Sequence, residues 1–276
     1  MNKKFMLLIL ALTLSVSILA GCSAPAPAAP PATGTTKTVL KIGMDDNYPP
    51  MEYRNENNEL VGFDVALGKA LAEKLDMTPE FISTAWDGIF IGLDTGNYDV
   101  IMSAVSITPK RLETLGFTKP YLANGQVIIT RNGAETVTDP SDLAGTKVGV
   151  QMGTTGDVAA EKYKADNGFE IVKYDSIIQT FSGMDAGHVD YIVVDYPVGI
   201  EYVAKSPDKY AMTDVQFTNE PIGIAVKKDN TELVAKLNTA LDELKADGTL
   251  KAISEEWLGD DYTSDIDEEL NFVETE

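Results

Sequence analysis

The sequence has few of the residues from which disulfides, metal centres and histidine-based active sites are built. Of its 276 residues, one is cysteine and one is histidine. Cys22 has no partner for a disulfide within the chain, and His188 lies in a Gly-His-Val-Asp segment typical of an exposed turn. We therefore expect no metal site, no cofactor and no histidine acting as a general base.

Positive charge is also scarce. The chain carries 22 Lys and Arg residues against 43 Asp and Glu residues, which gives a formal net charge of −21. Nucleic acids and anionic lipids are bound by basic patches, so the composition argues against both as ligands. Part of the acidic excess is local, because residues 260–276 hold eight acids and no base. We expect residues 261–276 to form a solvated, acidic tail.

Long apolar runs are limited to the N-terminus. Lys3 and Lys4 precede the apolar stretch Phe5–Leu19, which at about 15 residues is shorter than the roughly 20 needed to span a bilayer. Leu19-Ala20-Gly21-Cys22 resembles the lipobox of bacterial lipoproteins. This pattern predicts a signal peptide over residues 1–21 and lipid on Cys22, which would anchor the protein to the outer face of the cytoplasmic membrane.

The segment that follows Cys22 has no charge until Lys37. It consists of Ala, Pro, Thr, Gly and Ser, a composition that cannot bury a core and that favours an extended tether. We expect residues 22–37 to be a linker between the lipid and the folded part of the protein.

Strand and helix patterns alternate along the rest of the chain, which indicates an α/β fold with mostly parallel sheets. In one predicted helix, Phe63, Leu67, Leu71 and Leu75 recur every four residues. The predicted strands are 39–44, 80–83, 98–102, 126–130, 147–150, 170–173, 191–194 and 222–226, and the predicted helices are 64–75, 87–95, 158–165, 231–246 and 250–257.

One candidate half-site follows the apolar stretch that ends at Met102. The hydroxyls of Ser103, Ser106 and Thr108 gather there with the guanidinium of Arg111. Thr108 can cap a helix whose first position is the proline that follows it. Small ligands bind at the carboxyl ends of strands in open α/β sheets, and a guanidinium beside hydroxyls and helix-end N–H groups suits a carboxylate.

A second half-site carries the opposite charge. The strand 147–150 runs into Gly153–Gly156, a Gly-Thr-Thr-Gly turn before a predicted helix, and free N–H groups at a helix start favour an anion. Further along, the apolar strand 191–194 ends in Asp195, which can accept an ammonium group. Together the two half-sites offer donors for a carboxylate and an acceptor for an amine, which is the outline of a site for a free amino acid.

On these residues the chain resembles the extracytoplasmic solute-binding proteins of polar amino-acid ABC transporters (bacterial solute-binding protein family 3). A departure is Ala104, where the family usually has Gly or Ser. The contact there usually comes from the main-chain carbonyl, so we expect little effect. The matching segments, in order along residues 38–260, are Gly43–Tyr53, Val61–Val65, Ala85–Gly88, Ser106–Arg111, Gly153–Gly156, Val194–Asp195 and Leu241–Leu250.

The resemblance implies a periplasmic-binding-protein-like fold of type II, with two domains joined by two crossing segments. Residues 38–124 and 222–260 would form domain 1, and residues 125–221 would form domain 2. Gly125 and the region Glu220–Ile222 are the hinge positions that it implies. The ligand would lie between the domains, and the protein would act as a monomer that delivers the ligand to the permease subunits of the transporter.

The resemblance also implies roles for individual residues. Arg111, Ser106 and Thr155 would hold the α-carboxylate of an L-amino acid, with Thr154 in the same turn. Asp195 and the carbonyl of Ala104 would hold the α-ammonium. The pocket for the ligand side chain would consist of Asp45, Tyr48, Trp86, Gln151 and Val194. Since Arg111 is the only basic residue of this set, we expect a polar or cationic side chain rather than that of glutamate.

Two other classes of function stay open at this point. The fold also hosts enzymes, but catalysis would need an acid or base free to titrate in the cleft, and the cleft acids Asp45 and Asp195 are assigned to ligand charges, while Glu52 lies beyond Pro49 and Pro50. A soluble sensor of an amino acid, or of cystine, would use the same module.

Overall fold

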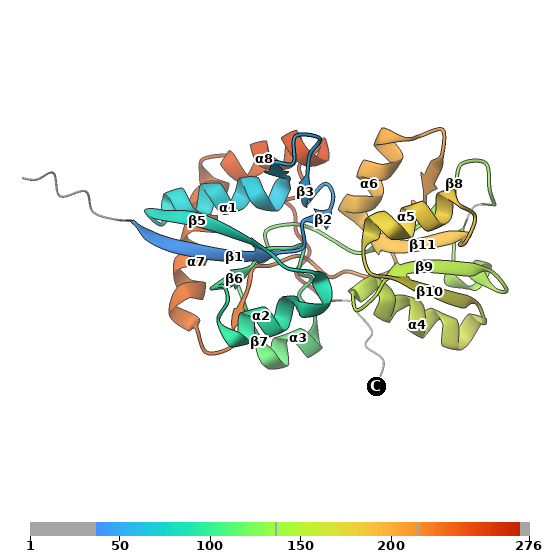
Figure 1. The fold of residues 1–276 in the computed structure, drawn as a ribbon, viewed down its shortest axis with the longest axis horizontal. Helices are drawn as coiled ribbons and strands as arrows, with labels where there is room; N and C mark the ends of the chain where they lie inside the picture. Colours follow the sequence, from blue (N-terminus) through green and yellow to red (C-terminus); the bar gives the residue numbers. More distant parts are fainter. Residues whose placement is uncertain (1–36, 136, 215, 271–276) are drawn as a thin grey trace, which may run out of the picture. The chain divides into compact units, whose positions relative to one another are not determined.

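The computed structural model describes residues 37–135, 137–214 and 216–270. The predicted signal peptide and most of the predicted tether, including Cys22, lie outside these residues. The described residues form two lobes, each built around a five-stranded sheet with helices against it (Figure 1). This arrangement is the α/β, two-lobed fold that the sequence predicts.

The sheet of the first lobe has the strand order β5-β1-β6-β13-β7. A small three-stranded sheet, β2-β3-β4, follows β1 in the chain and leads into the first helix. The strands of this lobe are β1 (Thr38–Met44), β2 (Asn47–Tyr48), β3 (Glu52–Arg54), β4 (Leu60–Val61), β5 (Met77–Ser83), β6 (Val100–Ile101), β7 (Leu115–Phe117) and β13 (Ala225–Lys227).

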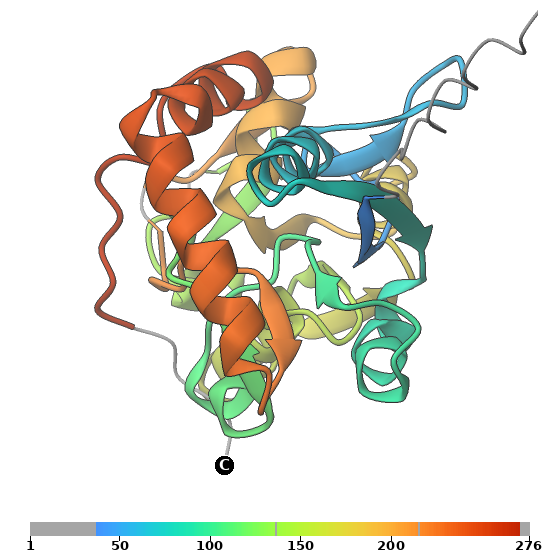
Figure 2. The same cartoon turned by 90° about the vertical axis from the view of Figure 1, so that its left-hand side faces the viewer.

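Helices cover the first sheet because each presents an apolar stripe to it. In helix α1 this stripe includes Leu67 and Leu71, which are fully buried. Helices α1, α7 and α8 contact one another, and α2 contacts β1, β6 and β13 (Figure 2). The helices of this lobe are α1 (Phe63–Lys74), the 3-10 helix η1 (Trp86–Gly88), α2 (Ile89–Thr95), α3 (Pro109–Thr114), α7 (Thr231–Ala246) and α8 (Thr249–Leu258).

The second lobe repeats this organisation with the strand order β10-β9-β11-β8-β12. Helices α4 and α5 begin at side-chain caps provided by Thr154 and Ser176. Its elements are β8 (Gln126–Arg131), η2 (Pro140–Leu143), β9 (Lys147–Gln151), α4 (Thr155–Asn167), β10 (Glu170–Tyr174), α5 (Ile177–Asp185), β11 (Tyr191–Asp195), α6 (Tyr196–Lys205) and β12 (Tyr210–Met212).

Both five-stranded sheets are mixed, which modifies the expectation of mostly parallel pairing. In the first sheet β1 pairs in parallel with β5 and β6, whereas β13 is antiparallel to both its neighbours. In the second, β9 pairs in parallel with β10 and β11, whereas β8 is antiparallel to β11 and β12. The antiparallel strands β8 and β13 each follow a segment in which the chain crosses between lobes.

The two crossing segments pair with each other. The N–H of Ile222 donates to the carbonyl of Leu122 at 2.9 Å, and the N–H of Glu220 donates to the carbonyl of Asn124 at 3.0 Å. At Gly125 the two segments approach each other closely, since a Cβ atom built on this residue would be 2.1 Å from the carbonyl oxygen of Thr218. Only glycine fits there without displacing the other segment. The role of this region as a hinge remains a prediction.

The start of the predicted acidic tail is packed on the first lobe. Thr263 is buried, and the carbonyl of Tyr262 accepts from the N–H of Ala123 at 2.9 Å. Asn219 donates to the carbonyl oxygens of Asp267 and Glu269. The expectation of a solvated tail is therefore wrong for Tyr262 and Thr263, where the ring of Tyr262 and backbone pairing outweigh the local acid content.

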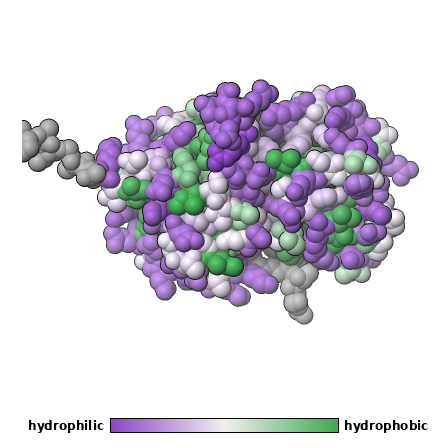
Figure 3. Space-filling view, in the orientation of Figure 1, coloured by the Kyte–Doolittle hydropathy of each residue, from purple (hydrophilic) through white to green (hydrophobic). Residues whose placement is uncertain are grey.

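The large apolar side chains that are exposed among the described residues are Val39, Ile91, Leu112, Met152 and Ile178. Figure 3 shows hydrophilic residues over most of the face that it presents, with apolar residues in small separate groups. None of the helices in the described part of the chain is both long enough and apolar enough to cross a membrane.

Candidate functional site

Helix α3 places Arg111 at the edge of a cavity between the lobes. Thr108 caps the helix, with its hydroxyl accepting from the N–H of Arg111 at 3.2 Å, and Pro109 occupies the first helical position. This confirms the predicted helix start. The guanidinium of Arg111 donates to the carbonyl of Ser106 at 3.0 Å and lies 5.5 Å from the ring centroid of Trp86 and 5.3 Å from that of Phe90. These contacts orient the cation across aromatic faces.

The start of helix α4 faces Arg111 from the second lobe. The helix begins at Thr155, three residues before the predicted start, and the hydroxyl of Thr154 caps it by accepting from the N–H of Asp157 at 3.2 Å. The hydroxyl of Thr155 lies 3.4 Å from that of Ser106, which belongs to the first lobe. Hydroxyls from both lobes and the positive end of a helix dipole therefore meet beside the guanidinium.

Asp195 ends strand β11 and is buried in a network of neutral donors. Its carboxylate accepts from the hydroxyl of Tyr48 at 2.5 Å, from the amide of Asn124 at 2.8 Å and from the amide of Gln126 at 2.7 Å. Burial raises the pKa of Asp195, while these hydrogen bonds and the charge of Arg111 act in the opposite direction. A buried carboxylate of this kind gains stabilisation from an added cation.

Asp45 follows strand β1 and also faces the cavity. It accepts from the side-chain amide of Gln151, in the second lobe, at 3.1 Å. Its own N–H donates to the hydroxyl of Ser103 at 3.0 Å. Burial raises the pKa of Asp45, and its hydrogen bonds to Gln151 and Asn47 partly offset that increase.

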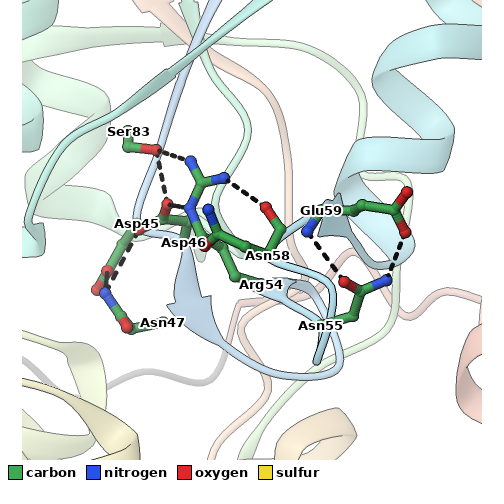
Figure 4. A network of polar contacts seen from close by, with 8 residues as sticks. All are labelled: Asp45, Asp46, Asn47, Arg54, Asn55, Asn58, Glu59 and Ser83. Carbon is green, nitrogen blue, oxygen red and sulfur yellow. Dashed lines mark hydrogen bonds and ion pairs between the residues drawn. The ribbon is translucent and has the colours of Figure 1, made fainter.

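The loop that carries Asp45 is tied down by its neighbour in the chain. Asp46 binds Arg54 Nε at 2.7 Å and accepts from the hydroxyl of Ser83 at 2.7 Å, and Arg54 donates to the same hydroxyl at 3.1 Å (Figure 4). Arg54 also donates to the carbonyl of Asn58. The outer face of the loop is thus bound to β3 and β5, while Asp45 points to the cavity.

Two aromatic side chains border the cavity from the first lobe. Trp86 is buried and donates its indole N–H to the carbonyl of Gly153, in the second lobe, at 3.0 Å. Tyr48 donates to Asp195, also in the second lobe. Both rings therefore border the cavity and contribute to the contact between the lobes.

The cavity is narrow: the space that its lining encloses is about 10 Å³, room for about one water molecule, and the empty space reaches about 270 Å³ only when open solvent at the mouth is included. Side chains of both charges and both lobes line it. The lining residues are Asp45, Tyr48, Trp86, Ser103, Ala104, Arg111, Gln151, Thr154, Thr155 and Asp195.

Nine of the eleven residues predicted for the ligand site line this cavity, and their contact with a ligand stays a prediction. Ser106 lies behind the lining, where it contacts Thr155 and Arg111. Val194 lies elsewhere: it is 3% exposed and packs in the apolar core. Successive residues of a strand point to opposite faces, so Val194 is directed away from the face that Asp195 uses. We do not retain Val194 as a pocket residue.

The sequence reasoning missed the polar side chains behind the lining. Asn124 and Gln126 hold Asp195, and Glu52 and Asp64 lie fully buried below Ser103. Glu52 and Asp64 fall in segments that carry the family resemblance, but only the fold buries them. The described residues hold no group of three or more His, Cys, Asp or Glu side chains that could bind a metal ion.

Residues 40–260 match the model of the bacterial extracellular solute-binding proteins, family 3. The chain belongs to this family. It is 32% identical over 227 residues to the L-cystine-binding protein TcyJ of Escherichia coli strain K12, covering 81% of this chain and 84% of that protein. It is 36% identical over 225 residues to the ABC transporter arginine-binding protein 1 of the same strain, covering 79% and 90%.

Solved structures of similar proteins share the fold. An ancestral arginine-binding protein bound to arginine is 38% identical, with a TM-score of 0.77, over 81% of this chain and 100% of that chain. The ancestral amino acid-binding protein AncCDT-1, described as a precursor of cyclohexadienyl dehydratase, is 35% identical, with a TM-score of 0.74, over 80% of this chain and 95% of that chain.

Proposed function

We propose that the protein binds one L-amino acid in the cavity between its lobes and delivers it, as a monomer, to the permease of an ABC transporter. The observation that carries this proposal is the pairing of charges in one cavity: Arg111 and Asp195 both line it, one from each lobe. A free amino acid carries the complementary pair, a carboxylate and an ammonium group, on one carbon atom. Family membership and the similarity to amino-acid-binding proteins support the same function.

In this proposal the α-carboxylate lies between Arg111 and the start of helix α4. The guanidinium offers a planar, bidentate pair of donors, and the hydroxyl and N–H of Thr155 add donors from the other lobe. The α-ammonium lies against Asp195 and the carbonyl of Ala104. An ammonium group there supplies the positive charge that a fully buried carboxylate lacks when its donors are neutral.

The ligand side chain would occupy the region of Asp45, Trp86, Tyr48 and Gln151. Among the described residues that line the cavity, Arg111 is the sole cation, and its charge is assigned to the α-carboxylate. A second carboxylate, as in glutamate, would therefore be buried beside Asp45 without a partner. A cationic or neutral polar side chain meets an acid and two aromatic faces instead. Arginine, lysine, histidine and glutamine fit this chemistry, and cystine is the alternative that the relative TcyJ favours.

A thermal-shift screen of single amino acids tests the ligand assignment. At a concentration of 100 times Kd, a ligand stabilises the protein by about 2.7 kcal/mol, which raises Tm by roughly 5–10 °C for a chain of this size. We expect such a rise with one or more of arginine, lysine, histidine, glutamine and cystine. Strong stabilisation by glutamate alone would contradict the assignment, and no stabilisation by any amino acid would contradict the proposed function.

A cleft enzyme and a sensor are the alternatives, and one observation bears on the first. Glu52 and Glu220 are buried acids whose pKa values are raised, chiefly by burial, but neither lines the cavity. The acids that do line it are held by donors from both lobes. We therefore propose binding rather than catalysis. Loss of uptake in a strain that lacks the protein would separate transport from sensing.

We also propose that lipid on Cys22 anchors the mature protein to the outer face of the cytoplasmic membrane. A lone cysteine after a lipobox-like segment supports this, and two acyl chains hold a protein stably where one does not. In cells that express Cys22→Ala, the protein should appear in the medium or remain unprocessed, as judged by fractionation and intact mass. A variant that is still processed and membrane-bound would contradict the proposal.

A further inference from the structure

Two acids, Glu52 and Asp64, lie together beneath the part of the cavity wall formed by Ser103 and Ala104. Glu52 comes from strand β3 and Asp64 from the first turn of helix α1, and both side chains are fully buried. Neither lines the cavity. Buried acids outside a binding site are costly unless they are paired or hydrogen-bonded, so their contacts show what they do.

Both oxygens of Asp64 accept a hydrogen bond. One of its oxygens accepts from the N–H of Ala104 at 2.8 Å and the other accepts from the hydroxyl of Tyr121 at 2.7 Å. Ala104 has a φ of 47°, a left-handed conformation that costs a residue with a Cβ atom about 1–2 kcal/mol. The hydrogen bond from its N–H to Asp64 stabilises this conformation and thereby sets the direction of the Ala104 carbonyl.

Glu52 holds Ser103, the residue before Ala104, by a hydrogen bond as well. Its Oε1 accepts from the hydroxyl of Ser103 at 2.7 Å, and this hydroxyl in turn accepts from the N–H of Asp45 at 3.0 Å. The chain of hydrogen bonds therefore runs from Glu52 through Ser103 to the backbone of Asp45. Both Ser103 and Asp45 line the cavity.

The second oxygen of Glu52 is buried close to the other acid, since the N–H of Asp64 donates to the carbonyl of Met51, the residue before Glu52, at 2.9 Å. Among the described residues no donor reaches Glu52 Oε2, although it is buried. Burial raises the pKa of Glu52 well above its ordinary value, and the charges of Asp64 and Asp45 and a hydrogen bond with Asp64 raise it further. The hydrogen bond from Glu52 lowers the pKa of Asp64, although burial keeps that pKa raised, at about 6.

We propose that Glu52 and Asp64 share one proton, carried on Glu52 Oε2 and donated to Asp64, and that this pair positions the Ser103–Ala104 segment of the ligand cavity. The assignment of the proton to Glu52 follows from the donors: Asp64 already accepts on both oxygens, while Glu52 Oε2 has no other partner. The titratable groups that face the pair are Asp45, Tyr48 and Tyr121. Both residues are positioning residues, since neither lines the cavity.

The shared proton predicts an asymmetry between two substitutions that each remove one negative charge. In Glu52→Gln, the amide oxygen still accepts from Ser103 and the amide N–H₂ donates to Asp64, so every bond is reproduced. In Asp64→Asn, the amide N–H₂ replaces one acceptor. It then meets either the N–H of Ala104, which is a donor, or the hydroxyl of Tyr121, which can accept from it only by leaving its own buried proton without an acceptor. Glu52→Gln should therefore be tolerated, whereas Asp64→Asn should lower Tm by several degrees.

The pH dependence of Tm without any ligand tests the proton itself. In the unfolded chain Glu52 ionises near its ordinary pKa of 4.5, whereas in the folded protein it stays protonated to a higher pH. The stability that this proton confers is complete below about pH 4.5 and declines as pH rises toward the folded pKa. The glutamine in Glu52→Gln does not ionise, so this variant keeps that stability as pH rises. The difference in Tm between Glu52→Gln and the wild type should thus increase as pH rises above about 4.5, toward the raised pKa of the folded protein.

Taking the difference between Glu52→Gln and the wild type removes the contribution of the other buried acids to the pH dependence of Tm. Glu220, whose pKa burial raises to about 7, titrates equally in the wild type and in Glu52→Gln, so its contribution cancels in the difference. A difference in Tm that does not change with pH would overturn the shared proton. Tolerance of Asp64→Asn together with damage from Glu52→Gln would place the proton on the other acid and overturn the assignment.

The role in the cavity rests on the proposed function and has its own measurement. With the amino acid that stabilises the wild type, calorimetric titration should give Glu52→Gln an affinity within about threefold of the wild type, and Asp64→Asn an affinity at least tenfold weaker. Equal affinities in all three proteins would contradict the positioning role. Failure of the wild type to bind any amino acid would instead contradict the proposed function and leave the result from Tm standing.

Discussion

Replacing Arg111 by alanine should abolish ligand binding whichever amino acid the protein carries. Removing one partner of a buried ion pair costs about 3–5 kcal/mol, which is roughly a hundred- to several-thousand-fold in Kd. Arg111→Lys should recover little of this loss, because an ammonium group cannot reproduce the two parallel donors of the guanidinium or its position over the rings of Trp86 and Phe90. Calorimetric titration of the folded variants measures the effect.

Asp195→Ala should also abolish ligand binding, because it removes the negative charge of the site. In Asp195→Ala, the ammonium of the ligand loses its acceptor, and the donors of Tyr48, Asn124 and Gln126 lose theirs. We expect a loss of affinity of the same order as for Arg111→Ala. Lys110→Ala is a suitable control, since Lys110 is an exposed cation in the same helix as Arg111. Near-wild-type affinity of either Arg111→Ala or Asp195→Ala would mean that the ligand binds elsewhere.

Gly125→Ala should weaken binding from outside the cavity. The new Cβ atom would lie 2.1 Å from the carbonyl oxygen of Thr218, which belongs to the other crossing segment and cannot rotate away as a side chain could. The two segments must separate, and Asn124 and Gln126, which flank Gly125 and hold Asp195, move with them. Overpacking of this kind costs about 1–3 kcal/mol of folding stability, so Tm should fall by roughly 2–12 °C, and Kd should increase because Asn124 and Gln126 no longer hold Asp195 in place.

Gly88→Ala provides the matched control for this substitution. Gly88 also lies near the cavity, two residues after Trp86, but a Cβ atom there has Thr84 Cγ2 as its nearest neighbour at 3.8 Å, an ordinary contact. Its affinity and Tm should stay close to those of the wild type. If Gly125→Ala matched Gly88→Ala in both measurements, the crossing segments would have room to move apart without cost, and the hinge position would need to be sought elsewhere.

Local signals explain what could be predicted from the sequence. The start of helix α3 was predictable because a threonine cap and a proline at the first helical position act within four residues. Asp195 was predictable because an apolar strand ends in it. The α/β class followed from the alternation of strands and helices. These features depend on neighbours in the chain, so the pattern of residues is sufficient to find them.

Features that depend on distant residues were not predictable in this way. Strands of two or three residues, such as β4 (Leu60–Val61), are too short to show a period. The orientation of Val194 depends on which face of its sheet meets the cavity. The burial of Glu52 and Asp64 depends on residues far along the chain, and the packing of Tyr262 on a segment more than a hundred residues before it.

The position of strand β13 has a consequence for the order in which the protein folds after export. This strand lies between β6 and β7 in the first sheet, although it follows the whole of the second lobe in the chain. A chain that has emerged only to about residue 220 already contains every strand of the second sheet and lacks an inner strand of the first. The second lobe can therefore complete its local contacts early, whereas the first must close a loop of more than a hundred residues, the slower kind of contact in folding.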